Sequence, residues 1–159
     1  MDAIKYIALS ALPIVAIIIC RGYASFVDSA IALSGSYRDF LCHIERRLGG
    51  YMTPPRRLGE GFDDPNLASF TRMISEGRSL CEAYLAESGA LPTSVREILN
   101  GYFSDFGKGE LSLELRRVRE AICALDRVIS QEKEQGNKQK RLCAAVAPSL
   151  AVGILILLI

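Results

Sequence analysis

The chain of 159 residues contains one histidine, His43, and Cys42 directly precedes it. A thiol with an imidazole base is a combination that nucleophilic catalysis uses. Consecutive residues of a helix, however, point about 100° apart, so these two side chains do not face each other if the segment is helical. A multi-histidine metal site is impossible with one histidine. We therefore predict that the chain is not an enzyme and that it binds no metal and no cofactor.

Phosphate and nucleic-acid chemistry are also poorly supported. The glycines occur at positions typical of helix ends, and none forms a phosphate-binding loop with the required lysine and hydroxyl spacing. The chain has 19 Lys and Arg against 18 Asp and Glu, a net charge of +1. A nucleic-acid surface needs an excess of positive charge to replace phosphate counterions. We expect no nucleic-acid partner.

Charged pairs are the remaining candidates for recognition. Arg56 and Arg57 follow two prolines in a segment that connects two predicted helices, where recognition residues concentrate. Asp63 and Asp64 form an acidic counterpart, and Glu45 lies on the preceding helix. The competing interpretation is a solvated surface, since acidic residues nearby offset most of the arginines. These five residues are the predicted partner-binding set.

Both ends of the sequence are apolar. Residues 142–159 carry no charge and follow Lys138, Lys140 and Arg141, and about 18 helical residues nearly cross a bilayer. A buried core helix is the alternative. Residues 1–23 can also span as a retained helix, against a cleaved signal peptide or a lipoprotein signal ending at Cys20. The isoleucines before that cysteine argue against the lipoprotein signal, because the site requires a small residue there.

Flanking cations predict the orientation. Arg21 follows the first apolar stretch, and Lys138, Lys140 and Arg141 precede the second, whereas the outer flanks hold only Lys5. Because basic residues are retained on the cytoplasmic side, we expect the central part of the chain to face the cytoplasm. The five cysteines show no paired spacing typical of a disulfide framework, in agreement with a reducing compartment.

The central part has helical periodicity almost throughout, which predicts an all-α fold. Apolar residues recur at steps of three and four from Phe26 to Leu48, from Val95 to Phe106 and from Leu111 to Ile129. Shorter helices are expected after Thr53-Pro54-Pro55 and Asp64-Pro65, and capping boxes at Ser79 and Ser94 predict two helix starts. We expect a six-helix antiparallel bundle over residues 24–130.

Residues 131–141 are polar on every side. A helix there has no apolar face to bury, so we expect a solvated basic stalk, helical unless Gly136-Asn137 interrupts it. The predicted order is therefore a span at 1–23, the bundle at 24–130, the stalk at 131–141 and a second span at 142–159.

This order of features resembles the stage III sporulation protein AB family of endospore-forming bacteria. That family has an amino-terminal span, a long helix with a Glu-rich end and a Tyr-x-x-Thr-Pro-Leu motif. Glu45 and the run from Gly50 to Pro55 resemble it, with one residue instead of two between Tyr51 and Thr53 and with Pro55 in place of leucine. Phe106-Gly107 matches the family's turn before its last helix, and residues 137–141 match its polar stalk.

The resemblance implies a domain similar to the inner-membrane platform protein of type II secretion and type IV pilus machines. It implies a location in the mother-cell membrane facing the forespore, within a channel complex. The expected partners are a cytoplasmic assembly ATPase, other membrane subunits, lipids and further copies of the chain. A membrane-tethered helical module that binds and senses a ligand is the alternative function.

Overall fold

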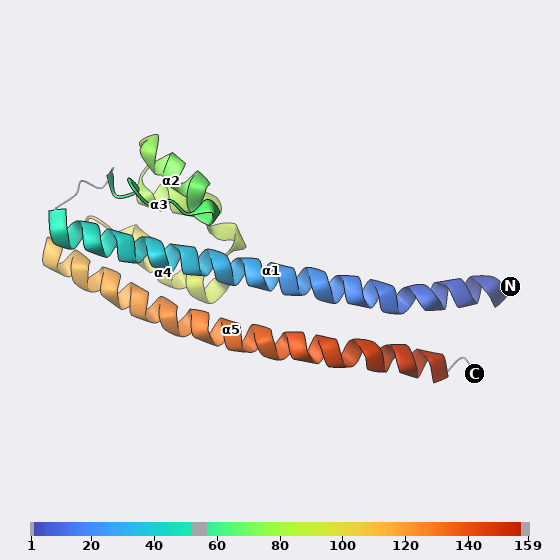
Figure 1. Ribbon diagram of the computed structural model, residues 1–159. Helices are drawn as coiled ribbons and strands as arrows, with labels where there is room; N and C mark the ends of the chain where they lie inside the picture. Colours follow the sequence, from blue (N-terminus) through green and yellow to red (C-terminus); the bar gives the residue numbers. More distant parts are fainter. Residues whose placement is uncertain (1, 52–56, 157–159) are drawn as a thin grey trace. The chain divides into compact units, whose positions relative to one another are not determined.

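The computed structural model describes the backbone of residues 2–51 and 57–156, and the side chains of residues 18, 20–50, 57–142, 145 and 146. Every regular element in this part of the chain is a helix (Figure 1). The α-helices are α1 (Asp2–Tyr51), α2 (Ala68–Ser75), α3 (Leu80–Glu87), α4 (Thr93–Asp105) and α5 (Leu111–Ile156), with short 3₁₀ turns η2 (Pro65–Leu67) and η3 (Ser88–Ala90). The predicted all-α class is confirmed.

The chain divides into two compact units. The central unit is Ala30–Gln131, and the terminal unit combines Met1–Ser29 with Glu132–Ile159. We predicted the bundle at 24–130 and the stalk at 131–141. The short helix expected after Thr53 begins on residues outside the described part, and the residues from Leu58 to Gly61 form a turn.

Aromatic side chains form the middle of the central unit's core. Tyr37 and Phe40 project from α1, and both rings meet Phe70 of α2 edge to face, with centroids 5.4 and 5.0 Å apart. The ring centroids of Tyr84 on α3 and Phe103 on α4 are 5.0 Å apart. Rings in such tilted arrangements add about 1 kcal/mol per pair to the burial of their surface.

The predicted apolar stripes supply most of this core. Of the stripe on α5, Val118, Ile122, Leu125 and Ile129 are buried, as are Val95, Leu99, Tyr102 and Phe103 of α4. Phe26 is the exception, because it is 64% exposed. It belongs to the terminal unit rather than to the bundle, so the helical periodicity that includes it does not mean that it is buried in the bundle's core.

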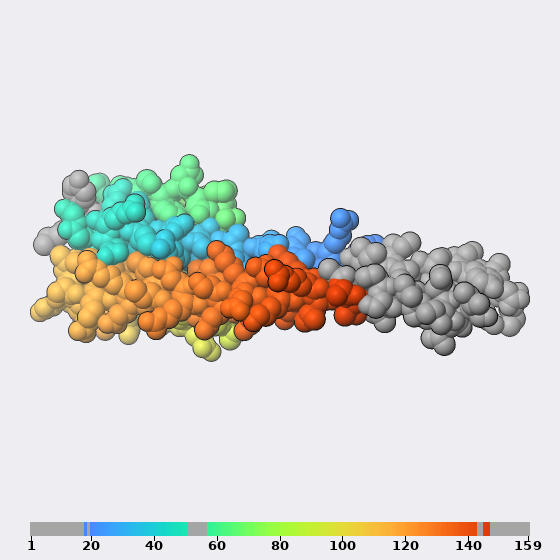
Figure 2. All heavy atoms as spheres, turned by 60° about the horizontal axis from the view of Figure 1, so that its bottom comes forward, coloured from blue at the N-terminus to red at the C-terminus, as the bar shows by residue number. Residues whose placement is uncertain are grey.

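Two ion pairs fix the antiparallel register of α1 and α5 in the central unit. Arg38 Nε donates to Asp126 Oδ1 at 2.9 Å, and Arg119 Nε donates to Glu45 Oε1 at 2.6 Å. Figure 2 shows the cyan surface of α1 lying directly against the orange surface of α5 here. Exposed pairs contribute at most about 1 kcal/mol each, so apolar packing stabilises this contact and the ion pairs select its register.

The two predicted capping boxes have different outcomes. Ser79 Oγ accepts from the Glu82 amide at 3.2 Å, and Glu82 Oε2 accepts from the Ser79 amide at 3.1 Å, so the first is confirmed. The second is wrong, because α4 begins at Thr93 with Pro92 as its N-cap residue and no side-chain cap. Proline fixes a φ suited to the start of a helix, which leaves Ser94 inside the first turn.

The terminal unit contains a tied pair of helical segments. Tyr23 Oη donates to Gln139 Oε1 at 2.7 Å, and Lys140 Nζ forms an ion pair with Asp28. Gly136 is buried and α5 continues through it without interruption. Of residues 132–141, only Glu132, Gly136 and Lys140 are not exposed, and their spacing of four places them on one side of the helix.

Within the described residues, no helix has a stretch both long enough and apolar enough to span a membrane. Most side chains of the predicted spans, 1–23 and 142–159, lie outside the described residues.

Candidate functional site

The two residues that could supply a thiol and an imidazole, Cys42 and His43, are both partly buried. The His43 ring packs beside Phe40 and Phe62, with centroid distances of 6.5 and 5.5 Å, and the two phenylalanine rings are themselves 5.2 Å apart. Burial lowers the pKa of its imidazole below the usual 6.5, and the nearby Arg47 lowers it further. Burial raises the pKa of the Cys42 thiol, which disfavours the reactive thiolate. The environment of each residue favours packing over nucleophilic chemistry.

The predicted partner-binding residues have different surroundings. Arg56 lies outside the described residues. Arg57 is exposed and its Nε lies 3.7 Å from Glu60 Oε1. Asp63 is exposed, whereas Asp64 Oδ1 accepts from the Asn66 amide at 2.8 Å and so caps η2. Asp64 therefore also has a structural role.

Glu45 is likewise bound within the fold, by Arg119, with the two side chains 29% and 66% exposed. A partner that uses Glu45 must share it with this arginine or displace it.

The predicted membrane-flanking cations all belong to the terminal unit. Lys138 pairs with Glu134 one turn earlier at 2.8 Å, and Lys140 pairs with Asp28 across to α1. Arg21 and Arg141 are exposed. The four cations therefore belong to one unit, although Arg21 and the other three come from opposite ends of the sequence.

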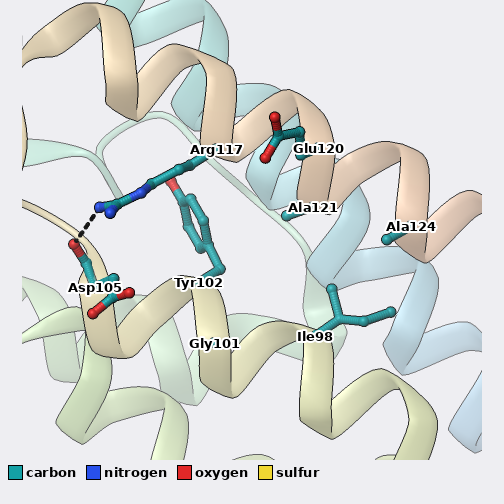
Figure 3. A pocket seen from close by; sticks show the side chains of 8 residues that line it. All are labelled: Ile98, Gly101, Tyr102, Asp105, Arg117, Glu120, Ala121 and Ala124. Carbon is teal, nitrogen blue, oxygen red and sulfur yellow. Dashed lines mark hydrogen bonds between the residues drawn. The ribbon is translucent and has the colours of Figure 1, made fainter.

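One surface hollow of the central unit lies between α4 and α5 (Figure 3). It has a volume of about 270 Å³. Each helix contributes four residues at the spacing i, i+3, i+4 and i+7, which is one face of a helix. They are Ile98, Gly101, Tyr102 and Asp105 from α4, and Arg117, Glu120, Ala121 and Ala124 from α5.

Small residues create this hollow. Gly101, Ala121 and Ala124 have little or no side chain, so the two helices leave a groove where larger residues would close it. A Cβ added at Gly101 meets no heavy atom within 4 Å. A groove between two helices is a surface into which a third helix can pack its side chains.

Polar groups lie at one end of the groove. Arg117 Nη1 donates to the Asp105 carbonyl oxygen at 3.3 Å and lies 3.6 Å from Glu114 Oε1 (Figure 3). The Tyr102 hydroxyl is buried and has no hydrogen-bond partner among the described residues. Burial raises the pKa of Tyr102, and the Glu114 carboxylate raises it further, so the hydroxyl stays protonated.

Glu114 closes the turn that leads from α4 into α5. Its Oε1 accepts from the Gly107 amide at 3.2 Å and from the Gly109 amide at 3.3 Å, and the residue is 5% exposed. The left-handed φ of +80° at Gly107 turns the chain at this point. This carboxylate thereby holds the polar end of the groove in place.

Sequence reasoning missed the groove, although a signal was present. Two small residues, Ala121 and Ala124, lie three positions apart beside the apolar stripe predicted for residues 111–129. In the other helix, Gly101 interrupts a strong helical pattern. Which helix lies opposite which is a property of the fold, so the two halves could not be matched from the sequence.

No group of three or more His, Cys, Asp or Glu side chains within the described ranges is gathered closely enough to hold a metal ion. Comparisons of the chain with protein-family models, curated proteins and solved structures gave no match.

Proposed function

We propose that the chain is a platform subunit that is anchored in a membrane at both ends and that docks other proteins on a helical bundle in the cytoplasm. In this proposal residues 1–23 and 142–159 span the bilayer, and the bundle counts six helices including the short one expected after Thr53. No catalytic step is assigned to it.

The observation that supports this proposal most strongly is that one unit contains both ends of the sequence. The two ends of the sequence form one compact unit, and it is tied by the Tyr23 to Gln139 hydrogen bond and by the Asp28 to Lys140 ion pair. This pairing is compatible with two spans that enter a membrane from the same side, and the flanking cations favour the cytoplasmic side.

The resemblance to the stage III sporulation protein AB family supports the choice of complex. We propose a sporulation-specific channel between mother cell and forespore, with the protein in the mother-cell membrane. Its partners are then a secretion-type ATPase on the cytoplasmic side and the other membrane subunits. The groove between α4 and α5 is the candidate docking surface, since its apolar floor and polar end suit an amphipathic helix.

Membrane extraction and co-purification test the platform. The tagged full chain should stay in mother-cell membranes after an alkaline carbonate wash and should co-purify with the ATPase and ring-forming subunits. Release by carbonate contradicts the anchor. A chain that always isolates alone, and whose deletion leaves spore formation intact, contradicts the platform.

A matched pair of glycine variants tests the docking surface. Gly101→Gln places a side chain in the groove, and Gly89→Gln places the same side chain on another exposed surface. Neither new Cβ meets a heavy atom within 4 Å, so both variants should fold. We expect Gly101→Gln alone to lose the co-purifying protein. Equal recovery with both variants excludes the groove and leaves the platform standing.

A further inference from the structure

Exposed apolar side chains are concentrated in the terminal unit. In the described part of the chain six large apolar residues are exposed, and all except Leu85 belong to this unit: Ile18, Tyr23, Phe26, Leu142 and Val146. Ile18, Phe26 and Leu142 are each more than 60% exposed. Exposed apolar residues gathered in one region indicate a contact surface for a protein or a membrane.

Two arginines lie among these residues without a carboxylate partner. Lys138 and Lys140 are each paired with an acidic residue, whereas Arg21 and Arg141 have no ion pair within the described residues. The Tyr23 to Gln139 hydrogen bond joins the two segments. In an antiparallel pair, residues 21 and 141 each lie two positions beyond that bond in the same direction, so they are at the same level.

The neighbouring residues favour a lipid as the occupant. Tyr23 and Leu142 are exposed within two residues of these arginines, and the sequence beyond is free of charge, from Tyr6 to Cys20 and from Leu142 onward. Aromatic residues with an apolar body and a polar tip are typical of the level of the lipid headgroups. Guanidinium groups bind phosphate oxygens in a bidentate manner.

We propose that Arg21 and Arg141 together bind the phosphate of an anionic phospholipid headgroup on the cytoplasmic side of the membrane. The inference rests on the proposed double anchoring and adds a lipid preference to it. A zwitterionic headgroup carries a cation that opposes the arginines, so an anionic lipid such as phosphatidylglycerol is preferred.

A single tryptophan can report on this site, because the chain contains none. Leu142→Trp places the fluorophore next to Arg141 at a position that is 63% exposed. The full chain is reconstituted in vesicles of phosphatidylcholine and phosphatidylglycerol, with one lipid or the other brominated as a quencher. We expect phosphatidylglycerol to bind beside the tryptophan roughly 25-fold more tightly, since each of the two cations near an anionic surface favours binding about fivefold.

Charge-matched variants separate the site from a general attraction. Arg21→Gln with Arg141→Gln should reduce the preference to about unity. Arg116→Gln with Arg127→Gln removes two exposed cations from the central unit and should leave the preference unchanged.

Equal quenching by the two brominated lipids in the Leu142→Trp chain contradicts the lipid site while leaving the anchor intact. An equal loss of the lipid preference in both double variants has the same meaning. Absence of quenching by either lipid contradicts the anchor itself, and the lipid site with it.

Discussion

Glu114 is the residue whose role is most clearly defined by its contacts. The buried carboxylate accepts hydrogen bonds from the amides of Gly107 and Gly109 and lies near Arg117. Hydrogen bonds to a charged group contribute about 1.5 to 3 kcal/mol, and removal of this carboxylate removes the acceptor of both bonds. We expect Glu114→Ala to lower the free energy of unfolding by about 2 to 3 kcal/mol, measured by urea denaturation followed by circular dichroism.

The exposed Glu110 provides the matched control, since it lies in the same turn. Glu110→Ala should change the free energy of unfolding by less than about 0.5 kcal/mol. An equal effect of the two substitutions contradicts the role assigned to Glu114.

His43 predicts a pH dependence of stability. Its pKa is lowered in the folded chain, first by burial and then by Arg47, while the unfolded chain keeps a value near 6.5. Between these two values the unfolded state binds more protons, so stability is complete above about pH 6.5 and falls as the pH decreases. We expect the urea midpoint to decrease between about pH 7 and pH 5.

A phenylalanine at position 43 removes the titrating group and keeps a ring packed beside Phe40 and Phe62. The decrease of the urea midpoint in this pH range should be smaller in His43→Phe. The same pH dependence in both proteins assigns it to other groups.

At the residue scale, the sequence alone did not predict which charged residues form ion pairs with one another across the fold. Glu45 and Arg119 are 74 positions apart, and only Glu45 belonged to the predicted partner-binding set. Their contact depends on the register of α1 against α5, which the periodicity of either helix alone does not give. Local pairs such as Arg116 with Glu120 on α5, by contrast, follow from helical spacing alone.

At the element scale, the capping box of α3 is the best test of local prediction. Ser79 satisfies the Glu82 amide, and replacing such a cap by alanine costs about 1 kcal/mol. We expect Ser79→Ala to lower the free energy of unfolding by about this amount and to increase amide hydrogen exchange in the first turn of α3.

Ser104→Ala is the control, because this serine is exposed within α4 and alanine has the higher helix propensity. It should be neutral or slightly stabilising. A loss in Ser104→Ala that equals the loss in Ser79→Ala contradicts a specific capping effect.

Helix existence was predicted well from periodicity, and helix boundaries less well. The stripes on α4 and α5 repeat over three or more turns, so burial of one face leaves a strong pattern in the sequence. The start of α4 was placed late because Ser94 and Glu97 match a capping box, whereas Pro92 with its fixed φ begins the helix. The proline and the capping-box pattern predict different helix starts, and the helix begins where the proline predicts.

At the scale of the whole molecule, the pairing of the two ends was outside the reach of sequence patterns. Residues 131–141 have no apolar periodicity, and the coverage of one side depends on Gly136 and on polar contacts with residues 23 and 28. Such contacts join positions more than 100 residues apart.

The proposed orientation makes Cys123 a reporter of sidedness. Its side chain is exposed on α5 in the central unit, whereas Cys20, Cys42 and Cys81 are half-buried. In a variant whose other four cysteines are replaced by serine, a membrane-impermeant maleimide should not label Cys123 in intact cells, and should label it once the membrane is opened. A variant with all five cysteines replaced by serine and with Ala3→Cys should show the opposite, because the amino terminus is then outside and accepts label before permeabilisation. Labelling of Cys123 in intact cells would place the bundle on the outer side, contrary to the arrangement of Arg21 and Arg141, and the ATPase partner would then have no access to it.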